Sequence, residues 1–210
     1  MYNGPLETFV VYDVEVAILP DYVKGGWENP EGMGFASAVA YAYGADRYYF
    51  FLHEDGRKGL IELLDGKTAV TFNGIKFDSR VVLGNNRDVN PRGTTRTEIH
   101  GFGNYDLLLE YIKARYGFTD VGEAEANLGG PVVVHDGSFS LDGLAEGTLR
   151  LRKTGHGAEA PLLYQAEQYE ALLAYNLHDV RLTRKLFEFA REYGFLVDRE
   201  GRVVTLNMEQ

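Results

Sequence analysis

Short apolar runs separated by turn residues dominate the first third of the chain. Residues 8–19 are dense in Val and Phe, residues 35–43 alternate small and aromatic side chains, and residues 47–52 are largely aromatic. Residues 68–72 form a fourth run that leads into Asn73-Gly74. Runs of this length, bounded by Gly, Pro and Asp, are typical of strands. The pattern predicts four strands, of which the first three form an antiparallel meander.

Helices are expected from the middle of the chain onward. The expected elements are helices over Lys58–Leu64, from Asp78, over Tyr105–Tyr116, from Ser140 and over Gln165–Tyr193, then a hairpin over about 195–206. Residues 117–138 carry no pattern that assigns them. This order predicts one α/β domain over residues 1–210 and is typical of the RNase H-like fold, with helices flanking a central mixed sheet of three antiparallel strands plus parallel strands.

Composition and charge narrow the possible chemistry. The chain is 45% hydrophobic and 25% charged, as in soluble globular proteins. It has no Cys, which excludes disulfides, zinc–thiolate sites and thiol nucleophiles. The net charge of −10 argues against coating nucleic acid by bulk positive charge, although bound cations reverse the charge of an acidic site. An acid-containing N-terminus and the lack of any run near about 18 apolar residues predict a cytoplasmic protein with no membrane partner.

The first chemical motif is Asp13-Val14-Glu15, which interrupts the strongest apolar run of the chain. Residues i and i+2 of a strand share a face, so both carboxylates point the same way. Two adjacent like charges repel unless a cation lies between them or one is protonated. Oxygen ligands suit Mg²⁺ or Mn²⁺, so the pair predicts a divalent metal site. A strand with one solvated face is the alternative.

Two later motifs supply further acids. Asp78 closes the run Asn73-Gly74-Ile75-Lys76-Phe77-Asp78, in which Gly74 allows a tight turn. Tyr175 and Asp179 are four residues apart, so a helix places them on one face. A Tyr hydroxyl in that position can orient a metal-held water. The alternatives are a helix cap for Asp78 and an incidental acid on an amphipathic helix for Asp179.

Taken together, the three motifs resemble those of the DEDD (DnaQ-like) 3′→5′ exonuclease family, in its tyrosine branch. They read Asp-x-Glu on an early strand, Asn-x-x-x-Phe-Asp after a later strand, and Tyr-x-x-x-Asp on the last helix. The histidine branch carries His five residues before the final Asp, where this chain has Ala174. Residues 140–184, with Leu-Asp-Gly-Leu-Ala-Glu-Gly-Thr-Leu and Lys-Thr-Gly-His-Gly, look most like the YprB-type ribonuclease H-like subgroup.

The resemblance implies a nuclease that releases nucleoside 5′-monophosphates from a 3′ end with two metal ions, Mg²⁺ or Mn²⁺. It gives Tyr175 the role of positioning the attacking water. The implied metal ligands are Asp13, Glu15, Asp78 and Asp179. The expected substrate contacts come from Asn73, Phe77, Lys153 and His156. Lys153 and His156 are equally well interpreted as plain loop residues.

Other functions on the same fold stay open at this point. They are a structure-selective endonuclease or ribonuclease H, a hydrolase of short oligonucleotides, and a catalytically silent nucleic-acid-binding domain. The expected partner is the 3′ end of single-stranded DNA or RNA, because no motif chooses between the two sugars. A polymerase or helicase partner is likewise left open.

Overall fold

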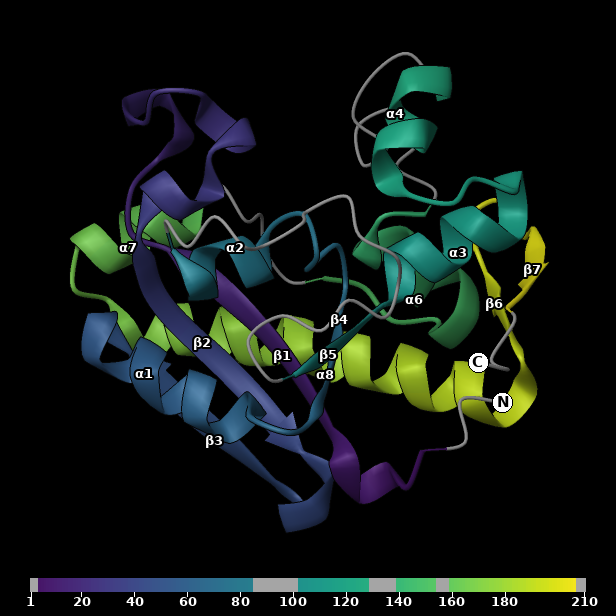
Figure 1. Ribbon diagram of the computed structural model, residues 1–210, viewed down its shortest axis with the longest axis horizontal. Coiled ribbons are helices and arrows are strands. Elements are labelled where there is room, and N and C mark those ends of the chain that lie inside the picture. Colours follow the sequence, from purple (N-terminus) through teal and green to yellow (C-terminus); the bar gives the residue numbers. More distant parts are fainter. Residues whose placement is uncertain (1–3, 85–101, 129–138, 154–158, 207–210) are drawn as a thin grey trace.

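The computed structural model describes residues 4–84, 102–128, 139–153 and 159–206, and these contain a five-stranded mixed sheet between layers of helices (Figure 1). The strands are β1 Phe9–Val16, β2 Phe35–Ala42, β3 Arg47–Leu52, β4 Thr68–Thr71 and β5 Gly103–Asp106. They lie in the order β3-β2-β1-β4-β5. The first three pair antiparallel, whereas β1, β4 and β5 pair parallel. The predicted α/β class and mixed sheet of the RNase H-like fold are confirmed.

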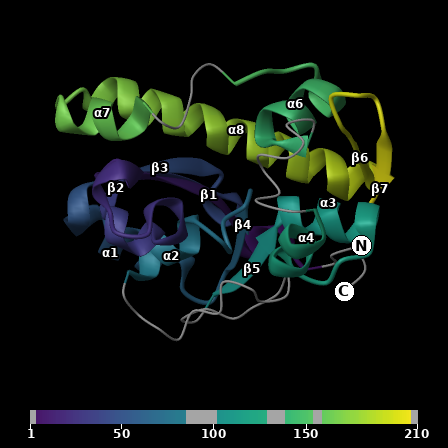
Figure 2. The ribbon, with the colours of Figure 1, turned by 90° about the horizontal axis from the view of Figure 1, so that it is seen from above.

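Helices cover both faces of the sheet (Figure 2). Within the described ranges they are α1 His53–Leu64, α2 Asp78–Leu83, α3 Leu107–Tyr116, α4 Val121–Leu128, α6 Leu141–Leu149, α7 Ala160–Gln165 and α8 Tyr169–Tyr193. The long helix α8 runs along one face, and α1 and α2 lie on the other (Figure 2). No helix in these ranges is long and apolar enough to cross a membrane.

The side chains of β1 alternate between two cores, as the period of a strand requires. Val11 packs in the core that α8 covers, together with residues of that helix. Tyr12 and Val14 pack in the opposite core, with residues of α1 and α2. The same alternation places Asp13 and Glu15 on the α8 side. The two acids therefore face the helix that carries the last predicted motif.

Four elements differ from their predicted form, and the first is α1, which begins at His53 instead of Lys58. The helix expected from Tyr105 begins at Leu107, because residues 103–106 pair with β4 as an edge strand and Asp106 caps the helix. The single helix expected over 165–193 is split into α7 and α8, with Glu167 between them in a left-handed conformation (φ 56°). α4 lies within the segment that had no assignment. Four-residue strands and helix breaks depend on tertiary contacts more than on local propensity.

The C-terminal segment forms a small antiparallel pair of its own. β6 Phe195–Val197 pairs with β7 Val203–Thr205, and Leu196 is fully buried. Helix α6 packs closely on β6, since a Cβ at Gly147 would overlap the backbone of Asp198. The carboxylate of Asp198 accepts from the hydroxyl of Tyr111, at 3.0 Å, and so ties this hairpin to α3.

The turn after β4 depends on the absence of a side chain at Gly74. An added Cβ there would overlap the side chain of Thr71, within β4. The turn is also fixed by Asp106, whose carboxylate accepts from the backbone N of Asn73 at 2.8 Å and of Ile75 at 3.1 Å. This tight turn determines where α2, and with it Asp78, begins.

Gly74→Ala is expected to lower the free energy of unfolding by about 1–3 kcal/mol, the usual cost of overpacking a tight site. Urea unfolding measures it. Gly103→Ala is the matched control, because its added Cβ would meet Thr68 Oγ1 at an ordinary 3.6 Å. Equal stability of the two variants would contradict the steric role of Gly74.

Candidate active site

Three carboxylates from two elements meet on the α8 side of the sheet. Asp13 and Glu15 come from β1, and Asp179 comes from α8. One ligand oxygen from each lies within 4.8 Å of the other two. Glu15 and Asp179 are buried and Asp13 is partly buried. Glu15 and Asp179, which are 164 positions apart in the sequence, thus belong to one acidic cluster between β1 and α8.

Asp78 reaches β1 through a hydrogen bond. Its Oδ1 accepts from the backbone N of Val14, at 2.8 Å. β1 pairs with β4 only over residues 9–11, which leaves the Val14 amide available to this carboxylate. The N-terminus of α2 has no side-chain cap, so the helix-cap alternative does not describe Asp78. The carboxylate lies outside the 4.8 Å cluster but adjoins it, since its charge raises the pKa of Asp13.

Burial raises the pKa of every acid at this site. The pKa values of Asp13 and Glu15 are well above their usual range, and neighbouring carboxylates raise them further. Burial likewise raises the pKa of Asp179, against the lowering effect of Lys153. It raises the pKa of Asp78 to about 7, although the hydrogen bond from Val14 lowers it. Burial therefore disfavours the ionised form of each acid, and a nearby positive charge offsets this effect.

Two polar side chains contact the cluster directly. The Nζ of Lys153 lies 2.6 Å from Oδ2 of Asp179. The Nδ2 of Asn176, which is fully buried, donates to Oδ2 of Asp13 at 2.6 Å. Lys153 is itself held by its backbone N, which donates to Oδ1 of Asp142 at 2.8 Å. Burial lowers the pKa of Lys153, but the Asp179 carboxylate outweighs this and raises it above its usual range, so Lys153 is cationic.

Tyr175 lies beside this ion pair. The Nζ of Lys153 is 5.4 Å from the centre of the Tyr175 ring. Burial, and then the charge of Asp179, raise the pKa of the Tyr175 hydroxyl. The hydroxyl therefore stays protonated and can donate a hydrogen bond. As predicted from their spacing, Tyr175 and Asp179 lie on the same face of α8.

A buried network of hydrogen bonds holds the scaffold under the site. Tyr12 OH lies 3.1 Å from Ser79 Oγ, and Asn104 Nδ2 donates to the same Oγ at 2.7 Å. Thr71 Oγ1 donates to Asn104 Oδ1 at 3.1 Å. These bonds join residues of β1, α2, β4 and β5. The residue from α2 is Ser79, which directly follows Asp78 in the sequence. Satisfied buried networks of this kind fix relative positions, because breaking one leaves an unpaired polar group.

The other predicted substrate contacts have separate positions. Asn73 adopts a left-handed conformation (φ 65°) in the turn after β4, with its backbone bonded to Asp106. The ring of Phe77 lies 5.9 Å from the ring of Trp27. His156 lies outside the described residues. None of these three therefore has a described contact with the acid cluster, in contrast to Lys153.

Neither Asn176 nor Asp142 was predicted from the sequence to belong to the site. Asn176 is three residues before Asp179, a spacing that places both on one helix face, so helical geometry could have identified it. Asp142 is the second of these residues. It lies in the first turn of α6, and it also fixes the backbone of Lys153. No local signal joins residues 142 and 153, because the link is a tertiary contact.

The acid cluster fits a divalent cation by its donor set. Asp179 Oδ1 is buried and accepts no hydrogen bond from the described residues. Asn176 Oδ1 is in the same situation. Carboxylate and amide oxygens with free lone pairs are the ligands that Mg²⁺ and Mn²⁺ prefer. The unpaired oxygens and the raised pKa values of the acids both indicate a site for positive charge.

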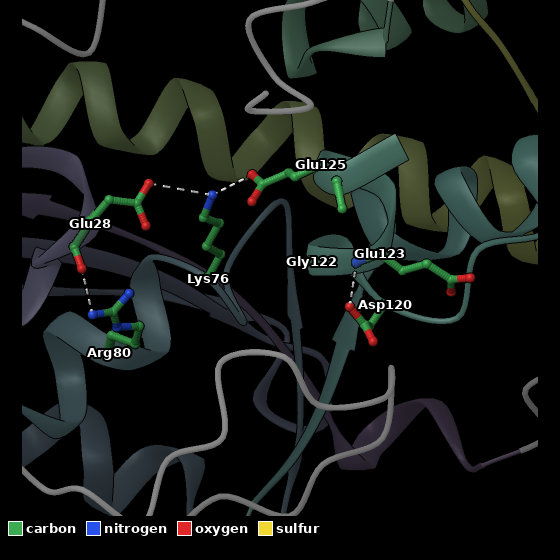
Figure 3. Close-up of a pocket in the computed structure, with 8 residues that line it drawn as sticks. Glu28, Lys76, Arg80, Asp120, Gly122, Glu123 and Glu125 are labelled. Carbon is green, nitrogen blue, oxygen red and sulfur yellow. Dashed lines mark hydrogen bonds and ion pairs between the residues drawn. The ribbon is translucent and has the colours of Figure 1, made fainter. Parts of the chain in front are cut away.

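A separate cavity of about 500 Å³ opens beside α2 and α4 (Figure 3). Lys76 lines it and lies between Glu125 of α4 and Glu28, with which it forms ion pairs, the latter at 3.9 Å (Figure 3). Arg80 of α2 donates to the backbone O of Glu28 at 2.9 Å (Figure 3). None of the four site acids lines this cavity. It adjoins the second motif, since Lys76 precedes Asp78 by two residues.

Comparison with known proteins supports the fold. No protein-family model matches the chain, and no curated protein matches its sequence. The structure is similar to that of the family B DNA polymerase from the hyperthermophilic archaeon Pyrobaculum calidifontis, with a TM-score of 0.52 and 14% identity. The likeness covers 87% of this chain and 24% of that polymerase. At this identity the likeness concerns the fold alone.

Metal-free protein is expected to lose stability as pH rises, through Asp78. Its pKa is about 7 in the folded state and about 3.9 in an unfolded chain, so between these values the folded state binds more protons. The stability that this proton contributes is complete below about pH 4. It decreases as pH rises and is gone above about pH 7. In EDTA, Asp78→Asn should therefore gain stability relative to wild type over this window and no further above it.

Urea unfolding at a series of pH values measures this difference. Asp55→Asn, at an exposed position of α1, is the matched control and should follow wild type at every pH. A difference between Asp78→Asn and wild type that is independent of pH would contradict the assignment.

Proposed function

We propose that the protein is a metal-dependent 3′→5′ exonuclease, which hydrolyses phosphodiester bonds at the 3′ end of single-stranded DNA or RNA. The observation that supports it best is the convergence of Asp13, Glu15 and Asp179, together with a buried oxygen of Asp179 that accepts no hydrogen bond from the described residues. Asp13 and Glu15 stand on a strand of the RNase H-like sheet and Asp179 stands on α8. The order of the three motifs along the chain also resembles that of the DEDD family. The polymerase with a similar fold is also named for chemistry on DNA.

The four carboxylates Asp13, Glu15, Asp78 and Asp179 would hold the two ions, Mg²⁺ or Mn²⁺. When bound, such ions lower the pKa of a water and neutralise charge on the scissile phosphate. The chain contributes the fixed geometry. Asn176 orients Asp13 through its amide, and the Val14 amide orients Asp78, so neither carboxylate must reorganise when charge develops.

Tyr175 and Lys153 supply the polar groups nearest to the acids. The Tyr175 hydroxyl, which keeps its proton, donates a hydrogen bond that orients the attacking water. The water needs no proton transfer to the tyrosine. Lys153 neutralises Asp179 in the absence of other cations, and its ammonium group is placed to contact a phosphate oxygen once Asp179 has another partner. In this proposal, Lys153 therefore contacts the substrate and is not a plain loop residue.

Asp13→Ala and Asp179→Ala are expected to reduce cleavage below detection, because each removes a carboxylate from the three-acid cluster. The measurement uses 5′-labelled single-stranded DNA and RNA with Mg²⁺, Mn²⁺ or EDTA. A ladder that shortens from the 3′ end, depends on metal and is lost in both variants is the expected result. Asp55→Ala, an exposed acid of α1, is the matched control and should cleave like wild type.

Thermal unfolding of each variant separates loss of chemistry from loss of fold. Undiminished cleavage by either cluster variant contradicts the assigned site. Discrete internal fragments, in place of a ladder, would retain the metal site and show an endonuclease. Metal binding without cleavage of either polymer would show a silent domain.

Tyr175→Phe is expected to slow cleavage on the order of 10- to 100-fold, the usual effect of losing an outer-shell hydrogen bond at a metal site. The affinity for metal, measured by calorimetry on the same variant, should stay close to wild type, because the four carboxylates are intact. Tyr193→Phe, at the exposed C-terminal end of α8, is the matched control. Equal rates for Tyr175→Phe and wild type would make Tyr175 a packing residue.

A further inference from the structure

The segment that carries Lys153 folds back along α6. The helix ends at Leu149, and Arg150 follows in a left-handed conformation (φ 59°). The backbone N of Lys153 then donates to Oδ1 of Asp142, at 2.8 Å, in the first turn of the same helix. A non-glycine residue at positive φ persists where its surroundings determine it. The ammonium group of Lys153 is thus held beside the acid cluster through its backbone as well as through its side chain.

Asp142 is in turn held by an arginine of the C-terminal hairpin. Arg199 forms ion pairs with Asp142 and with Glu146, and its Nε lies 2.6 Å from Oε2 of Glu146. The two acids are four residues apart on α6, so they share one face of the helix and repel each other. The planar guanidinium group of an arginine can pair with both at once. A continuous series of contacts therefore runs from Arg199 through Asp142 to Lys153.

The hairpin has a fixed position on α6. Asp198 is fully buried, and its Oδ1 accepts from the backbone N of Glu200 at 3.0 Å, within the turn between β6 and β7. The hydroxyl of Thr148 in α6 donates to the backbone O of Val197 and accepts from its backbone N, both at 2.9 Å. Figure 2 shows α6 next to β6 and to α8. The backbone of Arg199 is therefore anchored where its side chain reaches the first turns of α6.

The contribution of these ion pairs to stability is small, because the side chains are 41% exposed for Arg199 and 31% exposed for Asp142. Their effect on position is larger. Oδ2 of Asp142 pairs with Arg199, and Oδ1 accepts from Lys153, so both oxygens are engaged. Without the arginine, the carboxylate could turn toward solvent and release the backbone of Lys153.

We propose that Arg199 is a positioning residue for Lys153 and acts on it through Asp142. This inference rests on the proposed function, in which the ammonium group of Lys153 contacts the substrate. The hairpin follows all three motifs in the sequence, and it supports the site through α6 without contributing a metal ligand.

Cleavage by single and double variants tests this link. Arg199→Ala is expected to lower kcat/KM roughly 3- to 30-fold, because a displaced group next to the reacting atoms slows the reaction. The same substitution in a Lys153→Ala background should cause no further loss, since both residues then act through one missing group. Arg199→Lys should restore part of the rate, because an ammonium group lacks the planar fork that holds two carboxylates. Glu200→Ala, at the exposed neighbouring position of the turn, is the matched control and should cleave like wild type.

Hydrogen exchange at the Lys153 amide, followed by NMR, tests the same link without any cleavage. In Arg199→Ala this exchange should become roughly 5- to 10-fold faster, the effect of weakening one ordinary hydrogen bond. Asp142→Ala removes the acceptor itself and should speed the exchange at least as much. The amide of Val197, which donates to Thr148, reports the docking of the hairpin and should exchange as in wild type.

Unchanged exchange at Lys153 in Arg199→Ala would overturn the proposal, and so would an undiminished loss of cleavage on adding Arg199→Ala to Lys153→Ala. If exchange at Val197 also rises, the hairpin has undocked. Arg199→Gln, which keeps most of the side-chain volume, then replaces Arg199→Ala, and the same two results decide. If wild type cleaves neither DNA nor RNA, the proposed function fails, and exchange at the Lys153 amide still decides whether Arg199 fixes this segment.

Discussion

The constraint on which this structure depends is the burial of several like-charged carboxylates against one central strand. Asp13 and Glu15 stand where the strand period would otherwise place core residues, and Asp179 approaches them from α8. Burying an unpaired charge costs free energy. This cost is lowered by a raised pKa, by hydrogen bonds to the carboxylate or by a nearby cation. The described residues show all three responses, with Lys153 as the internal cation.

The backbone around these acids is irregular, both in the short pairing of β1 with β4 and in the turn after β4. β4 leaves β1 after three paired residues, which frees the amide that Asp78 binds. The turn that follows contains Asn73 in a left-handed conformation and Gly74 in contact with Thr71. Strained or tightly packed backbone of this kind persists where the neighbouring structure determines it, here through the carboxylate of Asp106.

The acid cluster and the charged cavity are lined by different residues. Asp13, Glu15 and Asp179 meet between β1 and α8, beside Lys153, whereas the charged cavity lies beside α2 and α4. Helix α2 belongs to both, because it begins with Asp78 and anchors the loop of Trp27 through Arg80. A displacement of this one helix would therefore move the Asp78 carboxylate and the loop of Trp27 together, and the buried hydrogen bond between Ser79 and Tyr12 opposes such a displacement.

The sequence by itself determined the α/β class, the first four strands and the helix face shared by Tyr175 and Asp179, because these depend on local periodicity. It placed Asp13 and Glu15 on one face for the same reason. Tertiary structure alone decided the strand order, the edge strand β5, the break between α7 and α8 and the contacts of Lys153. These depend on partners distant in sequence, and no pattern within a single segment records which partner it meets.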